Sequence, residues 1–176
     1  MNIKRFSLLL SSALALGALS TVASDALAEG TDTDDLGVTA TVIDNCTITA
    51  GTVAFGDYDP AIDNKAANLD GTGTVSVICT TGASAKVTLG QGISADTGSS
   101  DAVPLRRMVY DTNKFLSYSL FQETGRTTVW GNTDGTGVVA TADGASHDLT
   151  IYGRVAMDQN VPAGAYTDTV VATVTF

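Results

Sequence analysis

The sequence is poor in positive charge, in histidine and in cysteine. Its 176 residues include 9 lysines and arginines against 19 aspartates and glutamates, so the net charge is −10. Nucleic acid and anionic lipid are unsuitable partners for such an acidic chain, because both are themselves negative. One histidine and two cysteines make a poor set of metal ligands, and the sequence predicts neither a metal site nor a cofactor.

Long apolar runs are confined to the N-terminus. Residues 1–28 carry two basic residues, Lys4 and Arg5, near their start, continue with an apolar run from Phe6 to Leu19 and end in Ala26-Leu27-Ala28. This arrangement predicts a secretory signal peptide, cut before Glu29 or alternatively after Ser24. The run is too short, and too broken by serine and glycine, for a membrane span. We therefore predict an exported chain that does not insert into the membrane.

The two cysteines, Cys46 and Cys79, both lie in the exported part of the chain. Only one pairing is possible, and an oxidising compartment favours a disulfide. Closing a loop of this length stabilises the fold by about 3–4 kcal/mol through the entropy of the unfolded chain. The alternatives are two free thiols or a pair of metal ligands.

No stretch of the mature chain has sustained helical periodicity. Thr, Val and Gly dominate, and turn residues recur about every ten positions, which is typical of an all-β sandwich. A length of 148 residues suits one domain. Alternation of apolar and polar residues predicts strands at 47–50, 52–56, 74–80, 84–89, 105–110, 115–122, 127–130, 149–155 and 166–176. Polar, glycine-rich composition predicts loops at 57–73, 90–101 and 132–144.

Residue types that could support catalysis or metal binding occur, but not in a working arrangement. Ser146-His147-Asp148 contains the three members of a hydrolase triad, yet sequence neighbours point in different directions and cannot form a relay. Asp57, Asp59 and Asp63 suggest a calcium loop, but Ile62 stands where an EF-hand needs glycine. An irregular calcium loop is the alternative to a solvated turn. We predict that the protein is not an enzyme.

Both ends of the mature chain carry an alternating apolar stripe. A terminal strand must bury such a stripe, either in its own domain or in a neighbouring molecule. The N-terminal stripe consists of Leu36, Val38, Ala40 and Val42. The C-terminal stripe consists of Val170, Ala172, Val174 and Phe176.

Five segments together resemble a known family. They are Cys46-Thr-Ile, Phe55-Gly56, Val75-Ser-Val-Ile-Cys79, Tyr118-Ser-Leu-Phe-Gln-Glu123 and the ending from Pro162 to Phe176. The pattern resembles the spore coat protein U domain family and is similar to the major subunits of archaic, Csu-type chaperone–usher pili. The resemblance covers nearly the whole mature chain.

The resemblance implies an immunoglobulin-like sandwich that lacks its last strand. A periplasmic chaperone, and later the N-terminal segment of the next subunit, would fill the resulting groove by strand addition. The donor strand would then be the N-terminal stripe (Leu36, Val38, Ala40, Val42), and the edge of the acceptor groove would be the C-terminal stripe (Val170, Ala172, Val174, Phe176). Residues 29–45 would be leader and donor strand, and residues 46–176 the sandwich domain.

The resemblance also implies partners and a location. The partners would be a periplasmic chaperone, an outer-membrane usher, and further subunits in a head-to-tail homopolymer. The product would be a cell-surface fimbrium for attachment and biofilm formation. Two alternatives stay open: a spore-coat or envelope structural protein of the same fold, and a secreted binding domain whose own N-terminal strand fills its groove.

Overall fold

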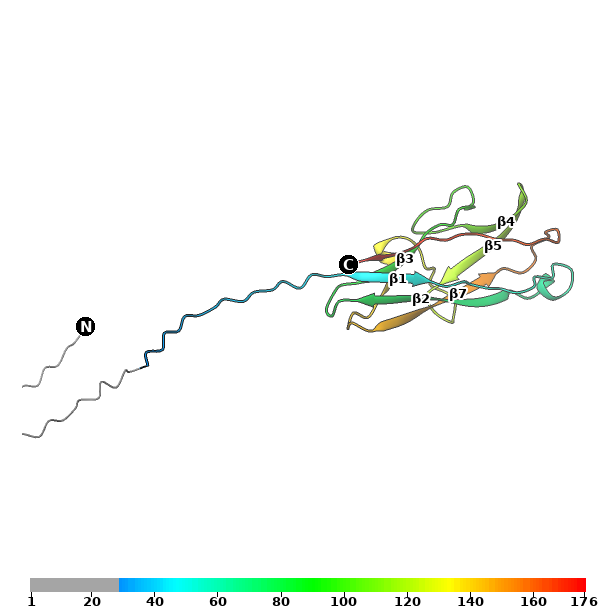
Figure 1. Cartoon of the computed structure of the whole chain (residues 1–176). Helices are drawn as coiled ribbons and strands as arrows, with labels where there is room; N and C mark the ends of the chain where they lie inside the picture. The colour runs from blue at the N-terminus through cyan, green and yellow to red at the C-terminus, as the bar shows by residue number, and fades with distance from the viewer. Residues whose placement is uncertain (1–28) are drawn as a thin grey trace, which may run out of the picture. The chain divides into compact units, whose positions relative to one another are not determined.

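The computed structural model describes residues 29–176, which divide into two units. The predicted signal peptide, 1–28, lies outside the described residues. Of the first unit, which ends at Ala40, the described part has no helix or strand and its side chains are exposed. The second unit, Thr41–Phe176, contains all the strands of residues 29–176 (Figure 1). No helix in the described part of the chain is long and apolar enough to cross a membrane.

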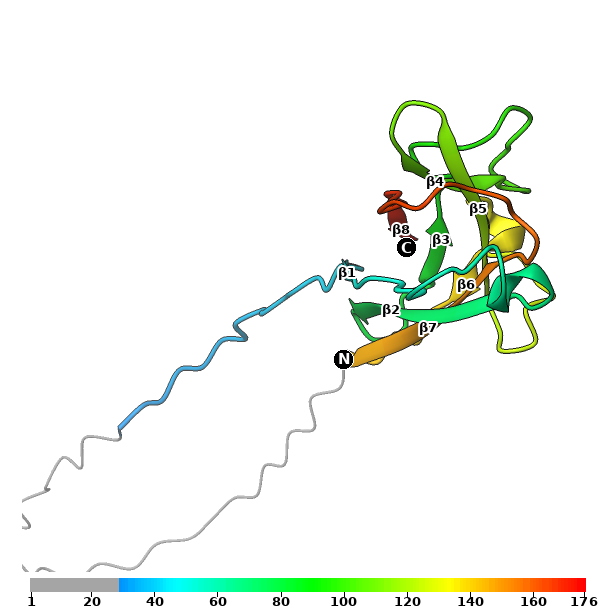
Figure 2. The same ribbon diagram turned by 90° about the vertical axis from the view of Figure 1, so that its right-hand side faces the viewer.

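Eight strands form two antiparallel sheets that face each other (Figure 2). The five-stranded sheet has the order β1-β2-β7-β5-β4, and the three-stranded sheet has the order β6-β3-β8. The strands are β1 (Cys46–Ala50), β2 (Leu69–Cys79), β3 (Lys86–Leu89), β4 (Arg106–Tyr110), β5 (Lys114–Phe121), β6 (Val138–Val139), β7 (Ser146–Val155) and β8 (Ala172–Thr175). Two 3₁₀ turns, η1 (Asp63–Lys65) and η2 (Asp134–Thr136), are the helical elements of the described residues. The predicted all-β sandwich is confirmed.

The core lies between the two sheets. Alternate residues of the long central strands point inward, as the period of two requires, so that Val75 and Val77 of β2 are fully buried. Trp130 is also fully buried, and its indole N–H donates to the carbonyl of Val87 at 2.9 Å. This bond satisfies the one polar atom of the largest side chain in the core.

Arg106 is the unexpected member of this core, because it is a cation with only 1% of its surface exposed. Its guanidinium donates to the carbonyls of Gly90, Leu89 and Trp130, each at 2.8 Å. Burial lowers the pKa of Arg106 to about 10, so the side chain remains protonated at neutral pH. It connects β4 of the larger sheet to the end of β3 in the smaller one.

The prediction of a loop over 57–73 was wrong at its C-terminal end, because β2 begins at Leu69. The misleading signal was the pair Gly71 and Gly73, which read as turn residues. A Cβ at Gly71 would lie 2.9 Å from the carbonyl oxygen of Ala54, and one at Gly73 would lie 2.9 Å from that of Thr52. These glycines therefore permit the close approach of a neighbouring backbone within a strand.

Other predicted boundaries also changed. β7 begins at Ser146 rather than at 149, and residues 52–56 contribute only the isolated bridge Ala54↔Thr72. The predicted strand 166–176 is regular only over β8. Its first part instead crosses to the larger sheet, where Thr167 pairs with Val109. Residues 127–130 form one bridge, between Val129 and Phe121, rather than a strand.

Gly153 in β7 offers a direct test of this packing. A Cβ there would lie 2.7 Å from two ring carbons of Phe55 and 3.0 Å from a methyl group of Val53. We expect Gly153→Ala to lower the free energy of unfolding by about 1–3 kcal/mol, as overpacking does. The matched control is Gly135→Ala, because a Cβ at Gly135 has no neighbour within 4 Å. Urea titrations followed by the fluorescence of Trp130 measure both; equal midpoints would contradict the prediction.

Candidate functional site

Two strands, β1 and β8, lie at sheet ends and each has an unpaired edge. The amide of Gly90 donates to the carbonyl of Val171 at 2.8 Å. This bond extends the β3–β8 ladder and fixes which residues of β8, and of the segment just before it, direct their backbone N–H and C=O groups toward β3. The backbone groups of Val170, Ala172 and Val174 consequently point away from β3, toward the open edge. These are three of the four residues predicted as an acceptor edge.

The same alternation applies to β1. The amide of Gly51 donates to the carbonyl of Thr74 at 2.8 Å, in register with the β1–β2 ladder. The backbone groups of Cys46, Ile48 and Ala50 therefore point away from β2. The outer edges of β1 and β8 thus each present a row of backbone donors and acceptors that their own sheet does not pair.

An apolar groove runs between residues 50–60 and residues 161–172. It consists of two adjoining hollows, of about 360 Å³ and about 590 Å³. Four residues line both of them: Val53, Phe55, Met108 and Tyr166. Inward-facing side chains of the larger sheet form its floor. They are Leu69, Val75, Leu116, Tyr118, Leu120, Ile151 and Val155. Such a row of apolar side chains left open between two strand edges is suited to receive an extended segment.

The groove is wide at one end and narrow at the other. Cα atoms of β1 and β8 come within 8 Å of each other. A strand needs about 4.8 Å on each side, so none fits between β1 and β8 at this separation. Val170 and Ala172 line the open part of the groove, whereas Val174 is half-buried outside the lining and Phe176 is 50% exposed. A strand that runs the full length of β8 requires β1 and β8 to move apart.

One polar pair interrupts the apolar lining. The hydroxyl of Tyr118 donates to Asp168 at 2.7 Å, and the amide of Ile93 donates to the other carboxylate oxygen at 3.0 Å. Burial and the bond to Asp168 raise the pKa of Tyr118, which keeps the phenol neutral. Each carboxylate oxygen of Asp168 has a partner, so this pair fixes the wall of the groove.

The residues predicted as a donor strand are fully presented to solvent. Leu36, Val38 and Val42 are 88%, 85% and 84% exposed, and Ala40 is exposed as well. They form no strand in this chain. An apolar stripe with a period of two is normally buried against a sheet or a core, whereas this one has no partner among residues 29–176.

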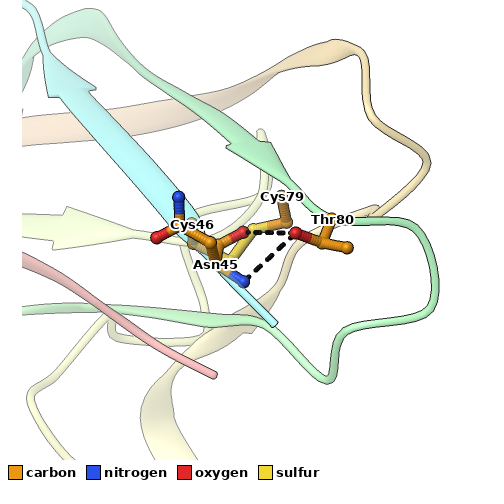
Figure 3. Close-up of a disulfide and its surroundings, with 4 residues drawn as sticks. All are labelled: Asn45, Cys46, Cys79 and Thr80. Atoms are coloured by element: carbon orange, nitrogen blue, oxygen red, sulfur yellow. Dashed lines mark hydrogen bonds between the residues drawn. A yellow bond between two sulfur atoms is a disulfide. The ribbon is translucent and has the colours of Figure 1, made fainter. Parts of the chain in front are cut away.

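The predicted disulfide is formed between Cys46 and Cys79, which stand opposite each other in the β1–β2 ladder (Figure 3). The exposed segment ends where β1 begins, so the disulfide lies at the first residue of the first strand. Cys46 is partly buried and Cys79 is buried in the core.

The residues weighed as a triad do not converge. Ser146, His147 and Asp148 are consecutive in β7 and alternate between its two faces. The ring of His147 contacts Asp143 at 2.8 Å, and Asp148 instead accepts a bond from Ser76 at 2.5 Å. No relay from serine through histidine to aspartate exists here.

The residues weighed as a calcium loop serve a turn. Asp59 accepts hydrogen bonds from the amides of Ala61 and Ile62, at 2.8 and 3.0 Å, in the manner of an Asx-turn. Residues 29–176 contain no group of three or more His, Cys, Asp or Glu side chains that could hold a metal ion.

The fold and the groove define an immunoglobulin-like sandwich with an apolar groove left open beside two strand edges. The chain belongs to the Spore Coat Protein U domain family, whose model matches residues 32–173. It is 44% identical over 166 residues to Protein U of Myxococcus xanthus, a match that covers 90% of this chain and 93% of that protein.

A solved structure supports the fold. This structure is the CsuC–CsuE chaperone–tip adhesion subunit pre-assembly complex from archaic chaperone–usher Csu pili of Acinetobacter baumannii. The match has a TM-score of 0.56 and a sequence identity of 23%. It covers 77% of this chain and 40% of the matched chain, so less than half of that chain is represented here.

The walls of the groove were the part of the site that the sequence did not reveal. Val53 and Phe55 were read as a short strand, and Met108 and Tyr166 as ordinary strand residues. The alternation of Val53 and Phe55 did indicate two inward side chains, but not that their strand leaves the sheet.

Proposed function

We propose that the protein is a structural subunit that polymerises head to tail, with the N-terminal stripe of one copy filling the groove of the next. The observation that carries the proposal is that one chain has both an apolar groove between two open strand edges and an exposed apolar stripe of strand periodicity. A contact between unlike surfaces of identical subunits leaves a free groove at one end and a free stripe at the other, so it builds a filament when its rotation does not close a ring.

The chemistry of the groove favours a strand as its occupant. Once β1 and β8 move apart, backbone groups of Val170 and Ala172 on one side, and of Ala50 on the other, would pair with an inserted backbone. Leu36, Val38 and Val42 would bury their side chains on the floor, each gaining about 1.5–3 kcal/mol from the removal of apolar surface from water. Ala40 contributes less and needs only a shallow site.

The open groove implies help before assembly. Unpaired apolar edges are sites of aggregation, so a subunit on its way to the surface needs a cover. We propose a periplasmic chaperone in this role and an outer-membrane usher as the site of assembly. The likeness to a pilus subunit bound to its chaperone supports this pathway. The assembled product would be a surface fimbrium that serves attachment and biofilm formation.

A second candidate is a coat or envelope layer made from the same polymer. The observation that favours it is the 44% identity to Protein U, together with membership of the Spore Coat Protein U domain family. Antibody labelling of sheared surface fibres and of purified spores separates the two. Label confined to fibres supports the fimbrium, and label confined to spores supports the coat.

Deletion of residues 35–43 tests polymerisation. Chains that join by strand addition give a ladder in SDS that collapses to monomer on boiling. We expect the deletion to abolish the ladder while the protein still binds its chaperone, because the groove is intact. The matched control deletes the acidic residues 29–34, which contain none of the stripe, and should retain the ladder. A normal ladder from the 35–43 deletion would contradict the proposal, and a stable monomer of the intact chain would indicate a self-filled groove.

A further inference from the structure

A disulfide and adjacent hydrogen bonds link the N-terminal segment to the sandwich at the start of β1. Cys46, the first residue of β1, is bonded through sulfur to Cys79 at the end of β2 (Figure 3). Just before it, the carbonyl of Asn45 accepts a hydrogen bond from the amide of Thr80 at 2.9 Å, and the amide of Asn45 donates to the hydroxyl of Thr80 at 3.2 Å. The hydroxyl of Thr80 also donates to the carbonyl of Asn45 at 3.3 Å, so one disulfide and three hydrogen bonds join two adjacent residue pairs.

β1 alone is a weak anchor for any force applied through that segment. It has five residues, forms the edge of its sheet and is paired on one side only, with β2. Three of its residues, Thr47, Thr49 and Ala50, are exposed. Tension that reached only the hydrogen bonds of β1 would detach this strand before it reached the core.

β2 is a far stronger anchor. It has eleven residues, lies between β1 and β7, and is paired with β7 over the whole of Leu69–Ile78. Val75, Val77 and Cys79 fill the core. Extracting β2 requires breaking two ladders and exposing this apolar surface together.

We propose that the Cys46–Cys79 disulfide and the Asn45–Thr80 hydrogen bonds form a tension clamp that transmits pull on the N-terminal segment directly to β2. The proposal rests on the proposed function for its purpose, because a filament is the setting in which one subunit pulls on another through this segment. The clamp keeps β1 and the loop behind it, residues 46–68, from being peeled off under tension.

Single-molecule force measurements on the full mature chain test the clamp without requiring polymers. Handles are attached at Gly30 and Gly135, so that tension enters through the N-terminal segment. Without the disulfide, residues 46–68 should release first, as an extra step of up to about 80 Å at the extension of a stretched chain. The oxidised chain should lack this step and unfold in the main event only.

The control uses handles at Asn113 and Gly135, so that tension enters through the turn after β4. Removing the disulfide should add no early step in this geometry. The disulfide is removed in two ways: by Cys46→Ser with Cys79→Ser and, as a route that starts from a correctly folded chain, by reducing the wild-type protein with a phosphine. Trp130 fluorescence verifies folding in both cases.

The outcomes separate the clamp from the proposed function. An early step in the oxidised chain, or no early step after reduction, overturns the clamp and leaves polymerisation unaffected. An early step that also appears in the control geometry identifies the disulfide as a general stabiliser and likewise overturns the proposal. If fibres never form, the force measurements still report on the clamp.

Discussion

Replacing Val38 by aspartate should abolish the SDS-resistant ladder, whereas replacing its neighbour Thr39 by aspartate should leave it. Val38 belongs to the exposed apolar stripe and Thr39 points to the opposite face of an extended segment. The two variants carry the same new charge one residue apart. They differ only in the face that carries it.

The expected difference follows from the cost of burying a carboxylate. In the groove, the side chain at position 38 would meet an apolar floor that includes Leu120 and Ile151, with no cation among the lining residues of the hollow. An unpaired polar group in such a place costs roughly 3 kcal/mol or more. This corresponds to a loss of about 100-fold in the affinity of one subunit for the next. The face that carries Thr39 would stay in water and cost little.

Two measurements make the test quantitative. Ladders from purified, chaperone-released subunits report polymerisation, and titration of a peptide of residues 29–45 against a chain lacking residues 29–43 reports affinity. The peptide with Val38→Asp should bind about 100-fold more weakly, and the peptide with Thr39→Asp within a few-fold of the natural one. Equal loss for both substitutions would mean that net charge, and not a buried face, controls assembly. No loss for either would exclude the stripe as the occupant of the groove.

The sequence was informative wherever local periodicity sets the structure. Alternation alone separated the two faces of β5 and β7, and the exported context paired Cys46 with Cys79. Glycine misled the prediction because it has two uses in strands. At Gly71 and Gly73 it permits the approach of another backbone, a relation between residues that local sequence does not encode.

The groove depended on a relation of the same kind. The apolar stripe at the C-terminus was visible, but its position beside β1, and the crossing of the preceding Thr167 to Val109, depend on the packing of two sheets. For the same reason the wide part of the groove extends toward Tyr166 and Val161 rather than toward Phe176. The assignment of the two stripes as donor and acceptor remains a prediction.

Arg106 was invisible in the sequence, because arginine in a strand normally faces solvent. We expect Arg106→Met to lower the free energy of unfolding by about 3 kcal/mol. The substitution keeps an unbranched side chain of related length, but it removes the donors to Leu89, Gly90 and Trp130, whose carbonyls are held at 2.8 Å. Each buried acceptor left without a partner costs about 1–3 kcal/mol. Relief from burying a charge recovers part of that loss.

The neighbouring Arg107 is the matched control for this substitution. Its guanidinium lies 4.0 Å from the ring centre of Phe115, pairs with Asp96 at 2.8 Å and donates to the carbonyls of Ser94 and Ala95, each at 3.1 Å, with its side chain partly exposed. Pairs and stacked cations in contact with water contribute about 0–1 kcal/mol each, so Arg107→Met should cost about 1 kcal/mol. Thermal unfolding should therefore separate the variants, because 3 kcal/mol lowers the Tm of a domain of this size by roughly 6–12 °C.

Sequence alone ranks Arg106 and Arg107 as equivalent, whereas the structure ranks the buried one far higher because it joins the two sheets beside the groove. A third variant, Arg106→Lys, keeps the charge but cannot reach three carbonyls from one planar group, and should fall between the wild type and Arg106→Met. If Arg106→Met proved as stable as Arg107→Met, the three buried bonds of Arg106 would contribute no more than the two longer bonds that Arg107 makes to the carbonyls of Ser94 and Ala95 at the surface.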